Sequence, residues 1–232
     1  MDRFCAFFFA VSILFVSACG SAPVITGAES DAEVVYKEGV HYLGKGKFDV
    51  AEKKFMKVIS DFSYSKYEPY ATVALGDTYF HKEDYPSAVE VYSRFVKMRP
   101  KHEKTPWAQL QIANSYFAQK PSDFFIFPNP AEKDIDIVDK AVEQYRYYLK
   151  NYPDDGNHEK GLKQLEKAEL VLIERDLRVA EFYAMKKKCP GVRARLENIS
   201  ANFTVTTDKN KKRIAKLLSK CQATAEGKKD AK

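Results

Sequence analysis

The chain of 232 residues is long enough for one large domain or two small ones, and its 45% apolar and 30% charged residues are typical of a globular protein with a core. The excess of 38 Lys and Arg over 32 Asp and Glu gives a net charge of +6, too small to indicate a nucleic-acid partner. Ten glycines and ten prolines are few for an all-β protein, and four cysteines are too few for a disulfide-framework miniprotein. Composition therefore favours an all-α fold.

Residues 1–18 have the pattern of a secretory signal peptide. Arg3 precedes an apolar run over residues 4–16, which Ser12 alone interrupts. Thirteen helical residues span about 20 Å, short of the ~30 Å hydrocarbon core of a bilayer. The run is therefore interpreted as a signal segment that is removed, and not as a membrane span.

Cys19 ends this segment in a Val-Ser-Ala-Cys sequence that resembles a bacterial lipobox. In such a sequence the Cys19 thiol carries lipid and becomes the mature N-terminus, so covalent lipid is expected and no cofactor. Residues 19–31 are rich in Ser, Ala and Gly and are predicted to be a lipidated tether. Gly20, where retained lipoproteins carry Asp, favours the outer membrane. An ordinary secretory signal with a chance cysteine is the alternative.

Four sets of small and aromatic residues share the spacing 3, 9 and 4, and the first three sets begin 37 residues apart. The sets are Gly39, Tyr42, Ala51 and Phe55; Gly76, Tyr79, Ala88 and Tyr92; Ala113 and Tyr116 with a delayed Ala141 and Tyr145; and Ala180, Tyr183, Val192 and Leu196. This period is typical of tetratricopeptide repeats, in which small residues allow two helices to approach and aromatic rings fill the remaining space. We predict an all-α tetratricopeptide-repeat solenoid of about five helical hairpins, the last one partial, over residues 32–222. A generic helical bundle is the alternative.

Hydrophobic periodicity divides this domain into helices, one of which is unusually long. The expected helices cover residues 32–44, 48–61, 68–81, 85–98, 105–118, 137–151, 157–187, 191–203 and 208–222. Residues 120–136 are predicted to form a proline-punctuated loop, and the charged residues 223–232 a disordered tail.

Six residues on the first helices of three repeats form a candidate peptide-binding stripe. They are Tyr36, Val40, Asp77, Phe80, Asn114 and Phe117. An extended peptide needs apolar pockets for its side chains and polar partners for its unpaired backbone, and this stripe offers both. The alternative is that the phenylalanines are core and the polar pair is merely solvated.

The C-terminal part of the chain is basic. Residues 186–232 carry 14 Lys and Arg against 4 Asp and Glu, a net charge of +10. Lys186, Lys187, Arg193 and Arg195 are the predicted partner-binding residues, facing an acidic protein or anionic lipid headgroups. A solvated face that keeps the array soluble is the alternative.

Two cysteines remain in the mature fold once Cys5 and Cys19 are accounted for. Cys189 lies near the start of one predicted helix and Cys221 near the end of the next, and these ends are neighbours in an antiparallel hairpin. A disulfide between them is therefore feasible in an oxidising compartment, and two separate reduced thiols are the alternative.

No catalytic or metal-binding motif is found. The four histidines are scattered, and the chain has no P-loop, Gly-x-Gly-x-x-Gly or Gly-x-Ser-x-Gly sequence. A protein that is not an enzyme and holds no metal is expected, with dispersed catalytic groups as the alternative.

Several segments resemble the BamD (ComL) family of outer-membrane assembly lipoproteins. They are Asp61–Tyr67, Arg94–Lys97 with Pro100–His102, Tyr145–Pro153, Val179–Tyr183, and Arg195 with Glu197. The resemblance implies a non-enzymatic, lipid-anchored component of the β-barrel assembly machinery (BAM) on the periplasmic face of the outer membrane. Its N-terminal repeats would receive unfolded outer-membrane proteins and its C-terminal repeats would dock on the periplasmic domains of BamA, with other BAM lipoproteins as possible partners.

A rival function is a periplasmic scaffold lipoprotein that binds cell-wall enzymes or peptidoglycan, or a secretin pilotin. These proteins are also lipidated repeat proteins, so periodicity alone does not separate them from an assembly factor.

Overall fold

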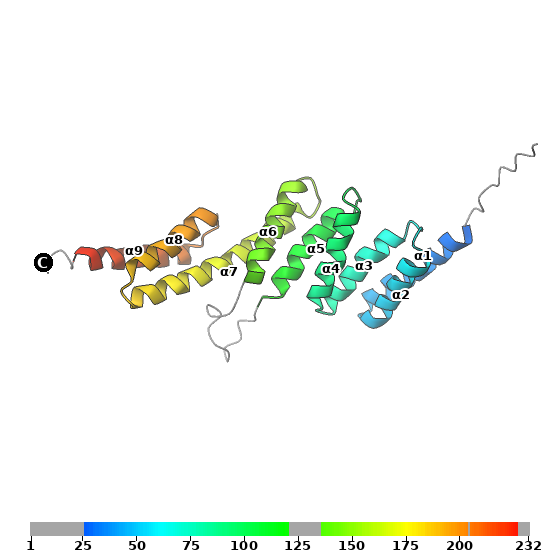
Figure 1. Ribbon diagram of the computed structural model, residues 1–232, viewed down its shortest axis with the longest axis horizontal. Helices are drawn as coiled ribbons and strands as arrows, with labels where there is room; N and C mark the ends of the chain where they lie inside the picture. The colour runs from blue at the N-terminus through cyan, green and yellow to red at the C-terminus, as the bar shows by residue number, and fades with distance from the viewer. Residues whose placement is uncertain (1–25, 121–135, 204, 227–232) are drawn as a thin grey trace, which may run out of the picture.

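The computed structural model describes residues 26–120, 136–203 and 205–226, which form nine α-helices and no strand (Figure 1). The helices are α1 (Thr26–Gly44), α2 (Phe48–Asp61), α3 (Glu68–His81), α4 (Tyr85–Met98), α5 (Thr105–Ala118), α6 (Asp136–Asn151), α7 (His158–Met185), α8 (Cys189–Asn202) and α9 (Asp208–Glu226). Each helix packs against the next, so the molecule is an elongated stack with α1 and α9 at opposite ends (Figure 1). The predicted all-α repeat fold is confirmed.

The helix boundaries follow the prediction closely except at the two ends. α1 begins at Thr26, six residues before the expected start, so residues 26–31 of the predicted tether are helical. An ion pair between Glu29 and Lys66 (3.7 Å) joins this added turn to the α2–α3 connection. α9 continues to Glu226, four residues past its predicted end. The signal segment, Cys19 and most of the predicted loop and tail lie outside the described residues.

Small residues stand where two helices of a repeat approach each other, as the repeat pattern predicts. A Cβ atom on Gly39 would lie 2.6 Å from the Phe55 ring, and one on Gly76 would lie 2.5 Å from the Tyr92 ring. Both distances are far below van der Waals contact, so a larger residue at either position would displace a buried ring.

Three of the hairpin turns in the described part of the chain share one geometry. Gly46, Glu83 and Lys187 adopt positive φ angles of 69°, 61° and 55°. The residue after each donates its backbone N–H to a tyrosine carbonyl, giving Lys47 to Tyr42 (2.9 Å), Asp84 to Tyr79 (3.0 Å) and Lys188 to Tyr183 (2.9 Å). The fourth set of repeat residues therefore forms the same turn as the first two.

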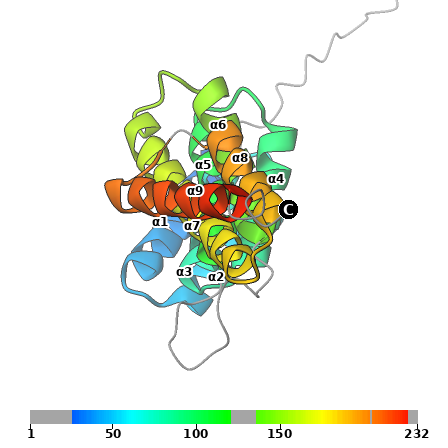
Figure 2. The ribbon, with the colours of Figure 1, turned by 90° about the vertical axis from the view of Figure 1, so that its left-hand side faces the viewer.

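The long helix α7 belongs to two cores. Its N-terminal half, with Ala168 and Leu172, packs into the core formed with α5 and α6. Its C-terminal half, with Ile173 and Leu177, forms a second core with α8 and α9. Figure 2 shows α9 lying across α7 and α8 at this end of the molecule. The stack thus has an N-terminal array, α1–α6, and a C-terminal unit, α7–α9, whose first helix also packs into the core of the array.

Candidate functional site

A small cleft opens between the first helices of the first three repeats. It has a volume of about 250 Å³ and lies where α1, α3 and the start of α5 meet. Its lining residues are Tyr36, Tyr70, Val73, Ala74, Asp77, Lys104 and Trp107. Three aromatic rings and one residue of each charge make this cleft chemically distinct from the surrounding surface.

Asp77 is the acidic residue of the cleft, and its carboxylate is held on one side only. The Tyr92 hydroxyl (2.6 Å) and the Trp107 indole N–H (3.2 Å) both donate to Asp77 Oδ1. No donor among the described residues is bonded to Oδ2. Burial raises the pKa of Asp77, because it penalises the charged form, and the two donated hydrogen bonds partly oppose that rise. Oδ2 is therefore an acceptor available to a ligand.

The aromatic walls of the cleft are fixed by their neighbours. The rings of Tyr36 and Tyr70 have centroids 6.4 Å apart, and the Tyr70 ring meets His102 edge-on at 5.4 Å. The Tyr70 hydroxyl donates to Glu103 Oε1 (3.0 Å). Lys104 Nζ lies 5.9 Å from the Tyr70 ring centroid, which brings a cation to the cleft.

The structure brings two of the six predicted stripe residues into this cleft, Tyr36 and Asp77. Val40 lies on α1 outside the cleft and is 44% exposed. Phe80 and Phe117 are half-buried and pack against the hydrophobic core, as the alternative interpretation of these two residues describes. The cleft therefore holds two of the six residues, and the other four lie outside it.

Asn114 accepts a hydrogen bond inside the array, and its position in the repeat explains why. The Tyr145 hydroxyl donates to Asn114 Oδ1 (2.7 Å), as the Tyr92 hydroxyl donates to Asp77. A buried hydroxyl needs an acceptor, whereas a phenylalanine needs none. In the first three repeats, the residue at the position of Asn114 and the aromatic residue of the second helix form the pairs Val40 and Phe55, Asp77 and Tyr92, and Asn114 and Tyr145. The polar residues of the stripe thus follow the tyrosines of the second helices.

Sequence reasoning missed Tyr70, Lys104 and Trp107. Tyr70 and Trp107 lie 37 residues apart and so occupy the same position in successive repeats. That position is one helical turn before the position of Tyr36, where the predicted peptide-binding stripe begins. Trp107 is also the only tryptophan in the sequence. The repeat register therefore contained the signal for both rings.

The predicted partner-binding residues occupy two different places in the C-terminal unit. Arg193 is exposed on α8, and Lys186 and Lys187 are exposed in the α7–α8 turn. Arg195 instead donates to Asp176 Oδ1 (3.2 Å), while Asn198 donates to Asp176 Oδ2 (2.6 Å). Arg195 therefore already has a carboxylate partner inside the chain. Asp176 is fully buried, so its charge needs this partner.

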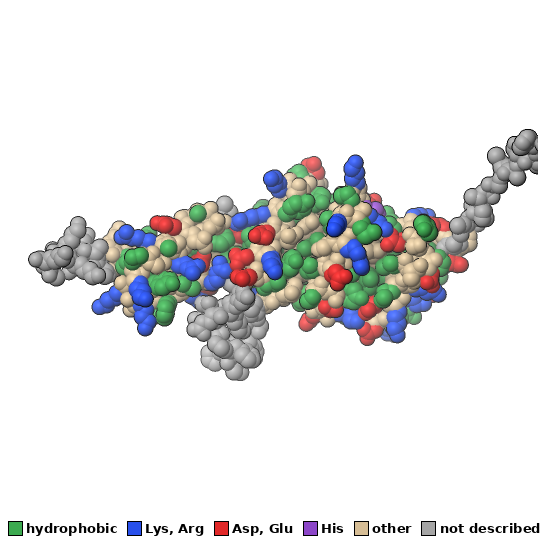
Figure 3. Space-filling model, in the orientation of Figure 1, with side chains coloured by type: hydrophobic (Ala, Val, Ile, Leu, Met, Phe, Trp, Pro, Cys, Tyr) green, Lys and Arg blue, Asp and Glu red, His purple; other side chains and the backbone are tan. Residues whose placement is uncertain are grey.

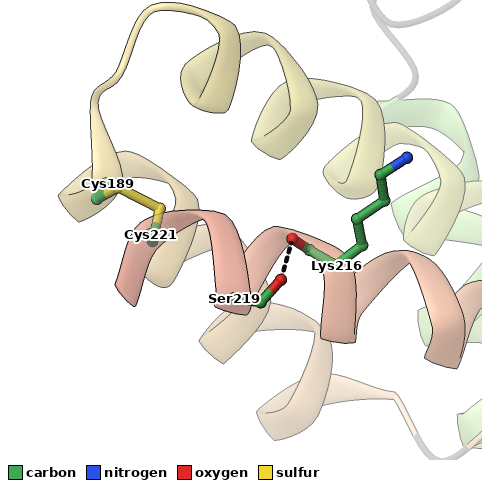
Figure 4. The surroundings of a disulfide bond; sticks show 4 residues. All are labelled: Cys189, Lys216, Ser219 and Cys221. Carbon is green, nitrogen blue, oxygen red and sulfur yellow. Dashed lines mark hydrogen bonds between the residues drawn. A yellow bond between two sulfur atoms is a disulfide. The ribbon is translucent and has the colours of Figure 1, made fainter. Parts of the chain in front are cut away.

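A disulfide closes this end of the molecule. Cys189, at the start of α8, is bonded to Cys221 near the end of α9, with Cα atoms 5.4 Å apart (Figure 4). Arg213 holds the preceding part of α9 against α7 through Glu174 and Glu181, at 2.5 Å and 2.9 Å. The C-terminal unit is therefore fastened by ionic and covalent bonds as well as by its core.

These features define a class of protein, a helical-repeat scaffold with an aromatic, acidic cleft near one end and a basic, disulfide-closed unit at the other. Within residues 26–120, 136–203 and 205–226, no cluster of three or more His, Cys, Asp or Glu residues could hold a metal ion. In the same ranges, no helix combines the length and the apolar character that a membrane crossing needs.

The model of the YfiO family, described as outer membrane lipoprotein, matches residues 28–231. The chain belongs to this family of outer membrane lipoproteins. The outer membrane protein assembly factor BamD of Vibrio cholerae is similar, with 24% identity over 181 residues, 77% of this chain and 73% of that one. The predicted family is thereby confirmed.

Two crystal structures of kinesin light chain TPR-like repeats from Podosopora anserina are also similar. They have TM-scores of 0.48 and 0.47 at 12% and 13% identity, over 85% and 86% of this chain and 98% and 97% of theirs.

Proposed function

We propose that this lipoprotein works in the assembly of outer-membrane β-barrel proteins, as a scaffold that receives an unfolded substrate in its cleft. The observation that carries the proposal is the aromatic, acidic cleft between the first helices of three repeats, in a chain of an outer membrane lipoprotein family. The similarity to a protein named as an outer membrane protein assembly factor supports the same function.

The chemistry of the cleft suits an extended polypeptide. Its volume of about 250 Å³ is smaller than the ~300–1,000 Å³ of typical small-molecule sites, and it matches one large side chain of a longer ligand. The rings of Tyr36, Tyr70 and Trp107 supply apolar contact for that side chain. Asp77 Oδ2 accepts a hydrogen bond from a backbone N–H, and Lys104 donates to a carbonyl or carboxylate oxygen.

Peptide capture by the cleft can be measured with the single tryptophan as reporter. A labelled C-terminal segment of an outer-membrane β-barrel protein is titrated with the chain, and anisotropy and Trp107 emission are followed. Tyr36→Ser should weaken binding at least tenfold, because aromatic anchors dominate such affinities. The matched control is Tyr64→Ser, since Tyr64 is fully exposed outside the cleft.

Equal affinity of the Tyr36 and Tyr64 variants, with unchanged circular dichroism, would contradict capture in the cleft. Recovery of amidases or a secretin, and of no β-barrel protein with periplasmic repeats, from detergent-solubilised outer membranes would favour the rival scaffold or pilotin function.

The C-terminal unit is proposed to dock on the periplasmic domains of BamA. Arg193 on α8 is exposed and offers a cation to an acidic partner surface. Arg193→Glu should abolish pull-down of those domains, and Lys167→Glu, an equal change of charge at an exposed site on α7, should not. Arg195→Ala should weaken docking only through loss of order around Asp176. Undiminished pull-down by Arg193→Glu would remove α8 from the interface.

Membrane attachment through lipid on Cys19 is part of this proposal. Cys19→Ala should leave the protein unprocessed or release it into the periplasmic fraction, because the acyl chains would be lost. Mature-length Cys19→Ala protein that stays in the membrane fraction after a high-salt wash, which removes ionic contacts, would contradict the anchor.

A further inference from the structure

The end of α7 exposes apolar and basic side chains together. Phe182 is 51% exposed and Met185 is 75% exposed, although large apolar residues are usually buried. Lys186, Lys187 and Lys188 follow directly, and all three are exposed. We refer to Phe182, Met185 and these three lysines as the basic tip. Figure 3 shows hydrophobic side chains surrounded by Lys and Arg over this end of the molecule.

The backbone of the basic tip is fixed by its surroundings. Met185 and Lys186, the last residue of α7 and the one after it, are three and four residues beyond Phe182 and so lie on its side of the helix end. Lys186 Nζ lies 5.7 Å from the Phe182 ring centroid. The positive φ of Lys187 turns the chain, and the disulfide of the next residue but one, Cys189, fastens the turn to α9. The tip is therefore a fixed surface and not the frayed end of a helix.

We infer that the basic tip binds the anionic phospholipid surface of the membrane, as a contact separate from the lipid anchor and from docking on BamA. Phenylalanine and methionine side chains can enter the interface between headgroups and acyl chains while lysines remain at the phosphates. Lysine is depleted at protein–protein interfaces, where arginine is preferred, so three consecutive lysines favour a lipid surface over an acidic protein. Membership of an outer membrane lipoprotein family places such a surface within reach.

This contact would set the orientation of the whole stack. The basic tip lies in the unit at the far end from α1 (Figure 1). Only residues 20–25 separate Cys19 from α1, and the seven residue steps from Cys19 to Thr26 span at most about 25 Å. A lipid at one end and the basic tip at the other would hold the long axis of the stack along the membrane, with the cleft between the two attachments.

The experiment uses the full mature chain with Cys19→Ser, exported to the periplasm so that the disulfide forms and no lipid is attached. Flotation with vesicles of phosphatidylethanolamine and phosphatidylglycerol should recover this protein, and vesicles of phosphatidylcholine alone should not. Replacing Lys186, Lys187 and Lys188 with Gln should lower the partition coefficient more than tenfold, because each lysine near an anionic surface contributes about fivefold. The matched control replaces Lys53, Lys57 and Lys97, exposed lysines of α2 and α4, with Gln.

Insertion of Phe182 into the lipid bilayer is measured separately, by fluorescence. Phe182→Trp should give an emission maximum that shifts to the blue on anionic vesicles and is quenched by brominated lipid, after subtraction of the Trp107 signal. Equal flotation of the two lysine triple variants, or absence of binding to anionic vesicles, would overturn the proposal. So would a tip variant that floats normally but fails to bind the BamA periplasmic domains, since the tip would then be a protein interface. Peptide binding in the cleft should be unchanged throughout, which separates this test from that of the proposed function.

Discussion

The N-terminal array, α1–α6, and the C-terminal unit, α7–α9, are built on the same hairpin but are held together differently. In the array, Phe55 lies directly over Gly39 and Tyr92 over Gly76, so stability depends on close apolar approach. In the C-terminal unit, Arg213 bridges two carboxylates of α7 and a disulfide ties α8 to α9. Ion pairs also cross the array, where Lys82 contacts Asp49 and Glu52, so among the described residues the disulfide is what distinguishes the C-terminal unit.

Ionic contacts add to the apolar core at the junction between the two regions. Arg146 of α6 donates to Glu169 of α7 and to the backbone carbonyl of Asn202 at the end of α8, both at 2.6 Å. Arg175 of α7 donates to Asp139 of α6 at 3.0 Å. The continuous helix α7, its apolar core and these bonds join the array to the C-terminal unit, so an angular change between them would have to break all three kinds of contact.

Of the changes considered, removing the disulfide should lower the unfolding free energy most. It should destabilise the C-terminal unit and leave the N-terminal array unchanged. Replacing Cys189 and Cys221 with Ser is expected to cost about 3–4 kcal/mol of unfolding free energy, from the entropy of the loop closed by residues 32 apart. Denaturant unfolding measures the loss. Hydrogen exchange should show lower protection in α8 and α9 and unchanged protection in α1–α4.

Reduced wild-type protein should behave like the double serine variant, and two free thiols in periplasm-derived protein would show that the bridge does not form. A uniform loss of protection along the chain would show that the two regions unfold together.

Replacing a close-approach glycine should act on the opposite region. Gly76→Ala is expected to cost about 1–3 kcal/mol, because the added Cβ lies 2.5 Å from the Tyr92 ring, even though alanine is the better helix former. Gly44→Ala is the matched control, since a Cβ there meets nothing within 4 Å. Thermal unfolding compares the two variants. Equal midpoints would show that the helices of the second repeat have room to separate.

Periodicity predicted the fold well because each repeat is a local unit that repeats its own contacts. The pairing of Gly76 with Tyr92 and the boundaries of α2–α5 follow from one spacing. The ends of the stack were less predictable. The added first turn of α1, residues 26–31, contacts Lys66, which lies outside that helix, and a local spacing does not show such a contact.

The cleft was predicted only in part, and the reason is geometric. Tyr36 and Asp77 were found because they lie on the chosen helical stripe, whereas Tyr70 and Trp107 belong to the neighbouring turn. A spacing fixes which residues share a helix face, but not which of two adjacent turns meets the next repeat. The internal partner of Arg195, Asp176, lies 19 residues away on another helix and carries no sequence motif.

The smallest effect is expected for Asn114→Val. This variant tests whether Asn114 stabilises the fold of the array or binds the peptide. Asn114→Val should cost about 1–2 kcal/mol, because the buried Tyr145 hydroxyl loses its acceptor. Adding Tyr145→Phe removes the hydroxyl and should restore about 1 kcal/mol, since the first repeat already has Val40 and Phe55 at these positions. A double-mutant cycle by denaturant unfolding measures this coupling.

Wild type, the two single variants and the double variant, each titrated with the outer-membrane peptide, complete the test. If Asn114 serves the fold, the stabilised double variant binds as wild type does, because the cleft residues are intact. Additive stability changes with a shared loss of peptide affinity would instead place Asn114 at the ligand, and the binding surface would then extend from α3 along α5 beyond the cleft.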